Sequence, residues 1–227
     1  MRKFLLSLIV LAAGCAAPSQ QLPPATAPPE AKAAARLPFE AWEIVASNLE
    51  VRVYRDGPMQ QLGHNHLISS ATLTGVIELR EPRAASGFTL ELPLDSLVVD
   101  DPEARAVAGA DFAAPVPMKD RDGTRRNMLG TSVLDVARQS VLRLTADSLK
   151  GGPVNYDARV RIGLRGEERV ITVPLTVEFA GDRMRVHAEL QLRHADLGLK
   201  PFAVAFGALS VRDDIGIDCR LEARRRT

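Results

Sequence analysis

Apolar and polar residues alternate one by one along much of the chain after residue 40. In residues 183–194, RMRVHAELQLRH, every second side chain is apolar until the last position, which is a histidine. Successive side chains of a strand point to opposite faces, so this segment would have one apolar and one charged face. The apolar face comprises Met184, Val186, Ala188, Leu190, Leu192 and finally His194, whereas His187 belongs to the charged face. The pattern predicts an antiparallel strand with one face in water.

The same alternation recurs in residues 153–165, PVNYDARVRIGLR, where Val154 would begin the apolar face, and in residues 209–222 near the C-terminus. Further strands are predicted at about 41–54, 64–80, 87–95, 140–150 and 169–180, each bounded by Gly, Pro or Asp, which gives about eight strands. Residues 100–138 break the rhythm. There the run DGTRRNMLGTSVLDVARQ predicts one or two short helices interrupted at Gly130.

The arrangement of these strands defines the fold class. No parallel alternation of strands and helices is seen, and antiparallel strands with one apolar face must either stack as two sheets or close into a barrel. Closure removes the exposed edges. We therefore predict an all-β fold over residues 39–227, an antiparallel eight-stranded barrel with one or two short helices inserted at about 100–138. Such a barrel has an interior that either holds one small ligand or is filled by side chains.

The residues before the barrel have the pattern of a lipoprotein leader. The run MRKFLLSLIVLAAGC starts with two basic residues, continues with an apolar stretch too short to span a membrane as a helix, and ends in small residues before Cys15. LAAGC resembles a bacterial lipobox, so residues 1–14 are predicted to be a lipoprotein signal peptide and Cys15 the acylated anchor. An ordinary signal peptide is the alternative. Similarity to known lipoproteins implies the periplasmic side of the outer membrane of a Gram-negative cell.

Residues 15–38 are rich in Pro and Ala and contain few large apolar side chains, so they predict a tether between the anchor and the barrel. If the leader is removed and Cys15 is acylated, Cys219 is the only thiol left, so no intrachain disulfide can form. The formal net charge of +1 gives no electrostatic footprint for nucleic acid. No serine elbow, HExxH helix, Walker loop or cysteine-based zinc pattern is present, and we predict that the protein is not an enzyme.

The best candidate for polar chemistry is the run LGHNHLIS, residues 62–69, which holds two of the four histidines. If it is extended, His64 and His66 share a face with Leu62 and Ile68 and are shielded from solvent. The pair could ligate a metal, contact the polar head of a ligand, or form hydrogen bonds at one end of the barrel. With His194 on the inward face, three imidazoles would suit zinc or copper. Nothing in the sequence places His194 near the pair.

Several stretches together resemble the YceI-like family, periplasmic lipocalin-like barrels that bind polyisoprenoid lipids. They are LGHNHLISSATLTGVIEL, NMLGTSVLDVARQSVLRLTADSL, VRIGLRGEERVITVPLTVEF and LRHADLGLKPF, and they occur in the family order over about residues 40–223. The chain departs from commoner members by having RHADLG where those have an asparagine-arginine-aspartate run, and it belongs to a subset that contains GHNH.

The resemblance implies a periplasmic barrel that holds an apolar, polyisoprenoid-like ligand, and with the anchor predicted at Cys15 the protein would be attached to the membrane. No cofactor is predicted. The side chains expected to contact this ligand are Phe88, Tyr156, Phe179, Phe202 and Phe206, together with His64, His66 and His194. Two alternatives stay open: a metal- or haem-binding periplasmic redox or stress protein that uses His64, His66 and His194, and a structural lipoprotein with a filled core. The sequence specifies neither the ligand nor the oligomeric state.

Overall fold

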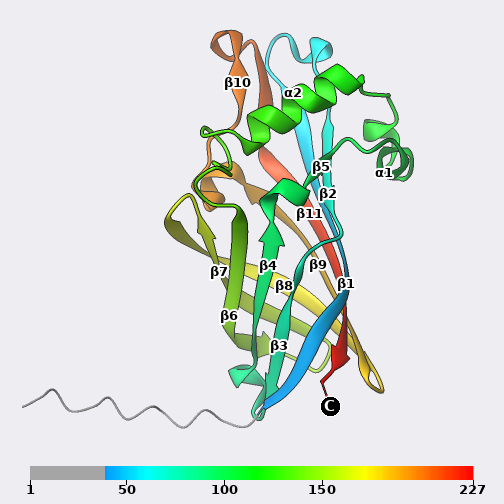
Figure 1. Ribbon diagram of the computed structural model, residues 1–227, viewed down its shortest axis with the longest axis vertical. Coiled ribbons are helices and arrows are strands. Elements are labelled where there is room, and N and C mark those ends of the chain that lie inside the picture. Colours follow the sequence, from blue (N-terminus) through cyan, green and yellow to red (C-terminus); the bar gives the residue numbers. More distant parts are fainter. Residues whose placement is uncertain (1–38, 227) are drawn as a thin grey trace, which may run out of the picture. The chain divides into compact units, whose positions relative to one another are not determined.

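The computed structural model describes residues 39–226, which fold into a closed barrel of antiparallel strands (Figure 1). The leader predicted at 1–14, the anchor Cys15 and the tether predicted at 15–38 lie outside the described residues. Eight strands form the barrel: β1 (Phe39–Asp56), β3 (Thr74–Arg80), β4 (Gly87–Pro93), β6 (Val141–Gly151), β7 (Asn155–Leu164), β8 (Glu167–Ala180), β9 (Arg183–Arg193) and β11 (Leu209–Arg225).

Each barrel strand pairs with its neighbours in the order β11, β9, β8, β7, β6, β4, β3, β1, and β1 pairs with β11 to close the ring. The closing pair runs from Trp42 opposite Arg225 to Asp56 opposite Ser210. This arrangement confirms the predicted all-β, eight-stranded barrel. It also leaves no unpaired edge among these eight strands, which is the physical advantage of closure.

The alternation in sequence corresponds to the inner and outer faces of the barrel. In β9, Met184, Val186 and Ala188 are buried while Arg183 and Arg185 are exposed, as predicted. The same holds along β7 from Tyr156 onward. The prediction was wrong for Val154, which is 44% exposed, because β7 begins only at Asn155 and the preceding residues form the turn from β6.

The strand predicted at 64–80 is two strands, β2 (His66–Ser70) and β3, both antiparallel to β1. Hydroxyl groups gather at the break: Ser70 Oγ lies 3.0 Å from Thr72 Oγ1, which donates to Ser96 Oγ at 2.6 Å. These side-chain bonds compete with the regular ladder and interrupt it. A short strand, β5 (Val98–Val99), pairs with β2 and extends the sheet there.

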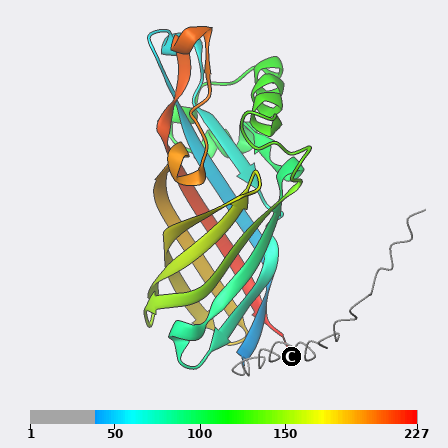
Figure 2. The same cartoon turned by 90° about the vertical axis from the view of Figure 1, so that its left-hand side faces the viewer.

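Two short α-helices lie within residues 100–138, as predicted: α1 (Pro102–Val107) and α2 (Met118–Leu129). Asp101 begins α1 by accepting hydrogen bonds from the backbone N–H groups of Glu103 and Ala104. Helix α2 ends before Gly130, at the predicted interruption, but the part of the run that follows Gly130 forms turns, and α1 lies before the run in which helices were predicted. Figures 1 and 2 show both helices at the end of the barrel opposite the β3–β4 connection. Of the helices in residues 39–226, none is long and apolar enough to cross a membrane.

Short elements complete the described chain. They are strand β10 (Ala203–Val204), which pairs with β11, and the 3-10 turns η1 (Gln60–Leu62), η2 (Arg83–Ala85), η3 (Leu94–Ser96), η4 (Ala110–Phe112), η5 (His194–Leu197) and η6 (Ala205–Gly207). The turn η1, the strand β10 and η6 lie at the same end as α2 (Figure 2). This end therefore holds the irregular structure that alternation could not predict.

Candidate functional site: an apolar cavity in the barrel

The inward faces of the strands enclose a cavity of about 330 Å³. Its wall is built from aliphatic side chains on several strands, such as Val160 and Ile162 of β7, Leu190 and Leu192 of β9, and Ile217 of β11. Residues that follow α2, including Leu134, also line it. A volume of this size is within the range of small-molecule sites, which are mostly apolar with a few polar groups. The sequence left open whether side chains fill the barrel or leave space for a ligand, and the structure shows a cavity.

The polar groups in the cavity wall are few and mostly paired. Tyr156 donates its hydroxyl hydrogen to the carbonyl of Pro153 at 3.1 Å, and His194 Nδ1 lies 2.9 Å from the carbonyl oxygen of Asp213. Arg83 Nε lies 3.3 Å from Glu81 Oε1. Because each of these three side chains already has a partner within the protein, the wall has few polar groups left to bind a ligand.

The cavity wall also contains Cys219, the single free thiol of the described chain. Burial raises the pKa of this thiol to about 11, and the negative charge of Asp218 adds to the effect. The group is therefore a neutral thiol at physiological pH. A buried neutral thiol behaves as a small apolar side chain rather than as a nucleophile.

Three of the predicted ligand contacts, Phe88, Tyr156 and His194, line the cavity. The prediction was wrong for Phe179, Phe202 and Phe206, which are not part of the wall. Phe179 ends the inward row of β8 but packs instead against Trp42, with ring centroids 5.6 Å apart. Phe202 and Phe206 belong to the irregular segment between η5 and β11, where alternation does not define an inner face.

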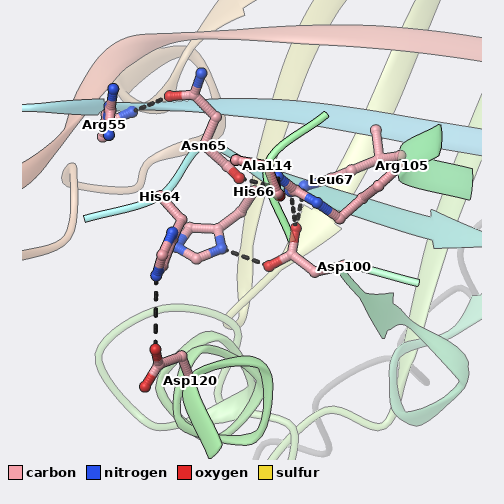
Figure 3. A network of polar contacts seen from close by, with 9 residues as sticks. All are labelled: Arg55, His64, Asn65, His66, Leu67, Asp100, Arg105, Ala114 and Asp120. Carbon is pink, nitrogen blue, oxygen red and sulfur yellow. Dashed lines mark hydrogen bonds and ion pairs between the residues drawn. The ribbon is translucent and has the colours of Figure 1, made fainter. Parts of the chain in front are cut away.

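The predicted histidine pair lies outside the cavity wall, in a polar network at the end of the barrel (Figure 3). His66 Nδ1 is 2.6 Å from Asp100 Oδ2, and the backbone N–H of Leu67 donates to Asp100 Oδ1 at 2.9 Å. Arg105 donates to the same Oδ1 atom at 2.6 Å. The side chain of Asp100 is completely buried, so this carboxylate joins β2 to α1 inside the protein.

Arg105 is also nearly buried, and its guanidinium has several partners. It donates to the carbonyl of Asn65 at 2.7 Å and to the carbonyl of Ala114 at 2.9 Å, and it lies over the ring of Phe112 with 5.6 Å between Cζ and the centroid. Because the ion pair of Arg105 with Asp100 is buried and Arg105 also bonds to Asn65 and Ala114, the network holds the segments that contain these residues together. Removing one partner of a buried ion pair is costly, because it leaves the other charge buried without compensation.

The network has a clear electrostatic signature at Asp100. Burial alone would raise the pKa of this carboxyl, but hydrogen bonds from His66 and from the Leu67 N–H, with the charges of His66 and Arg105, outweigh burial. The pKa of Asp100 is therefore lowered from its ordinary value of 3.8. Asp100 is ionised at neutral pH.

His64 is held more loosely than His66. Its Nε2 atom lies 3.5 Å from Asp120 Oδ2 on α2, and its ring centroid is 6.3 Å from that of His66. The prediction that both histidines share a buried strand face with Leu62 and Ile68 was wrong. Leu62 ends the turn η1 and is 69% exposed, whereas Ile68 is in the core, because β2 begins only at His66.

The three-histidine metal set is not assembled in the described residues. His64, His66 and His194 do not form a group whose ligand atoms lie within 4.8 Å of one another. The group that does meet this condition in residues 39–226 is His187, Glu189 and Asp218, on the outer face of β9 and β11. His187 faces outward as predicted. Asp218 is on the same outer face of the barrel but is buried, and its Oδ2 atom lies 2.8 Å from the guanidinium of Arg220.

Sequence reasoning missed Asp100 and Arg105. Asp100 precedes Asp101-Pro102, which is a recognisable helix start, but 34 positions separate it from His66. Only the pairing of β2 with β5 brings the carboxylate to the histidine. The one local signal was the pair of consecutive aspartates, of which a single one is needed to cap α1.

The structure is thus a closed antiparallel barrel around an apolar cavity, an architecture with room for one small ligand. Searches of family models and of curated proteins find no match to the sequence. Solved structures do match the fold. Burkholderia cenocepacia BcnA is 12% identical with a TM-score of 0.55, over 78% of this chain and 95% of that chain.

A polyisoprenoid-binding domain from Saccharophagus degradans, implicated in plant cell wall breakdown, is 17% identical with a TM-score of 0.53, over 82% of this chain and 98% of that chain. A mutant of the YceI protein of Campylobacter jejuni is 8% identical with a TM-score of 0.50, over 68% and 82% of the two chains. At such identities the likeness concerns the fold. The fold is that of the YceI-like barrels, as the sequence resemblance predicted.

Proposed function

We propose that this protein binds an apolar, polyisoprenoid-like lipid in the cavity of its barrel and acts as a carrier rather than as an enzyme. The observation that supports this proposal is the cavity of about 330 Å³ with an almost wholly aliphatic wall. Transfer of an alkyl or isoprenoid chain from water to such a wall is favourable by about 0.8 kcal/mol per buried CH₂ group. The polyisoprenoid-binding domain from Saccharophagus degradans, which shares the fold, takes a ligand class that fits this chemistry.

The cavity also selects against charged ligands. A bare charge inside the aliphatic wall would lose its hydration without gaining a partner, which costs several kcal/mol or more. Arg83 is the one lining residue with a permanent charge, and Glu81 neutralises it in part. The favoured ligand is therefore a neutral chain, with any polar head near a lining residue such as Arg83 or His194.

We propose further that the barrel works in the periplasm, attached to the outer membrane through an acylated Cys15. The support for this is the sequence LAAGC after a charged and apolar leader. An anchored carrier would stay close to the membranes in which isoprenoid lipids dissolve. The tether over residues 15–38 would let the barrel move about its anchor.

A fluorescent apolar probe, N-phenyl-1-naphthylamine, tests whether the cavity takes a ligand. Leu190→Trp should fill the cavity, because Leu190 lines it, and should abolish the increase in probe fluorescence. Gln191→Trp is the matched control, since the neighbouring side chain is exposed on the outer face. Equal probe binding by both variants and wild type, with intact folding by circular dichroism, would show that the probe binds elsewhere.

A further inference from the structure

The end of the barrel that carries η1 and β10 displays four large apolar side chains to solvent. They are Met59, 46% exposed, Leu62, 69% exposed, Val204, 43% exposed, and Phe206, which is completely exposed. We refer to these four residues as the apolar tip. Single exposed apolar residues are ordinary on a protein surface, whereas a cluster of them indicates an interaction site.

Main-chain contacts hold the two halves of the apolar tip together. The N–H of Met59 donates to the carbonyl of Ala208 at 2.8 Å. Gly57, with φ of +92°, lies so close to residues 207 and 208 that a Cβ atom there would be 2.7 Å from the Ala208 oxygen. The β1–β2 connection and the η6 segment therefore form one surface, and Figures 1 and 2 show them side by side.

The backbone presents Phe206 outward at a cost. Ala205 and Phe206 have φ values of +49° and +56°, in the left-handed region that residues other than glycine avoid. The aromatic ring gains no packing from this conformation, because it is fully exposed. An exposed aromatic side chain in a disfavoured conformation is best explained by a partner that covers it.

The charges around the apolar tip favour a lipid surface as that partner. Residues 57–63 and 197–210 contain no Asp or Glu, and their one charged side chain is Lys200, which is exposed. The carboxylates that border these segments each have a basic neighbour: exposed Asp56 follows Arg55, and Asp196 Oδ1 lies 3.5 Å from Arg193. Apolar side chains that enter the acyl region, with a basic residue at the level of the headgroups, are the pattern of interfacial membrane binding. A carboxylate in these segments would have opposed an anionic membrane.

The chain connects the apolar tip to the cavity wall over a few residues. Leu197 and Leu199 line the cavity and lead directly into the segment that ends at Phe206. Resting on the proposed carrier function, we infer that the apolar tip docks on a bilayer that contains anionic phospholipid, so that the apolar ligand passes between membrane and cavity at this end. The lipid surface is thus a second partner, distinct from the ligand inside the barrel.

Sedimentation with vesicles of phosphatidylcholine and phosphatidylglycerol tests this docking. All proteins are full-length chains with Cys15→Ser, so that no acyl anchor contributes. Phe206→Asp should weaken partitioning into vesicles by at least about tenfold, because an aromatic side chain no longer leaves water. Val204→Asp should weaken it as well. Val170→Asp is the matched control, since Val170 is also 43% exposed but lies on the outer face of β8.

A second variant reports insertion directly. In Phe206→Trp, the new indole should be quenched by vesicles with brominated acyl chains, over the background of the buried Trp42. Equal partitioning of Phe206→Asp and Val170→Asp, or no quenching of the new indole, would overturn the inference. So would a dimer, seen by light scattering, that dissociates in Phe206→Asp, because a second copy would then cover the tip.

The naphthylamine assay separates this inference from the proposed function. The tip variants should bind the probe in solution like wild type, because their side chains do not line the cavity. Probe binding without vesicle binding would refute membrane docking and leave the carrier function in place. Vesicle binding without any probe binding would refute the carrier function instead.

Discussion

At the scale of single residues, the buried carboxylate of Asp100 is the centre of a network of hydrogen bonds and ion pairs. This carboxylate has no solvent exposure and accepts hydrogen bonds from the Leu67 N–H and from Arg105, with His66 Nδ1 at 2.6 Å. The network connects β2, the segment after β5 and α1. These elements lie at the irregular end of the barrel. We therefore expect the stability of that end to depend on the negative charge of Asp100.

Asp100→Asn should lower the free energy of unfolding by about 3 kcal/mol or more, because it leaves the buried guanidinium of Arg105 without its counter-charge. Urea denaturation followed by circular dichroism measures this loss. Asp101→Asn is the control, since asparagine caps a helix as well as aspartate does. Equal effects of the two variants would mean that the buried ion pair contributes nothing beyond the cap.

The same residue predicts a dependence on pH. The pKa of Asp100 is lowered on folding from its ordinary value of 3.8, so its contribution is present above that value and is lost as the pH falls through the lower folded-state pKa. The difference in unfolding free energy between wild type and Asp100→Asn should therefore shrink in acid. A difference that stays constant down to the acid limit of folding would contradict the shift.

The sequence singled out His64 and His66 but not the partners that the structure gives them. Two imidazoles separated by one residue are visible in LGHNHLIS. The structure shows a hydrogen bond at one end of the barrel for His66, whereas His64 Nε2 lies 3.5 Å from Asp120 Oδ2. Their partners could not be predicted, because Asp100 and Asp120 lie far along the chain. Tertiary pairing decides such contacts, and alternation carries no information about it.

At the scale of elements, period-two alternation predicted the barrel strands because each has one face in the core and one in water. It failed where that condition ends. The strand expected at 64–80 is broken by the Ser70, Thr72 and Ser96 hydroxyls, and the segment between η5 and β11 leaves the barrel wall. The prediction that Phe202 and Phe206 line the cavity is therefore wrong.

Two adjacent positions of β7 test the face assignment. Val160 is 2% exposed and lines the cavity, so Val160→Arg should unfold the barrel or cost several kcal/mol of stability, because the new charge has no partner there. Arg159 is exposed, and Arg159→Glu should change stability by roughly half a kcal/mol or less. Thermal unfolding compares them; similar losses in both would contradict the inner and outer faces.

At the scale of the described barrel, eight strands close around an apolar cavity of about 330 Å³. Alternation predicted the closure but not the cavity, because the pattern is the same for a filled and for an open core, and only the family resemblance implied a cavity. The structure gives the cavity, and the fold matches barrels that include a polyisoprenoid-binding domain. Membrane attachment through Cys15 stays a prediction, since that residue lies outside the described part of the chain.

Attachment is tested in cells by Cys15→Ser, which removes the only acylation site that the lipobox provides. The parent protein should fractionate with membranes and carry a fatty acyl mass at its N-terminus. The variant should lose the acyl mass and move to the soluble periplasmic fraction, apart from any weak contact through the apolar tip. Unchanged fractionation after a high-salt wash would rule out the anchor.

The most direct test of the carrier proposal is the mass spectrum of lipids that co-purify with the protein from its native host. Wild type and Gln191→Trp should each bring a neutral, polyisoprenoid-like lipid in nearly stoichiometric amount, because the outer face does not contact the ligand. Leu190→Trp, which fills the cavity, should bring none while remaining folded. A wild-type preparation free of apolar lipid, or equal lipid in all three proteins, would contradict the proposal that the cavity holds the ligand.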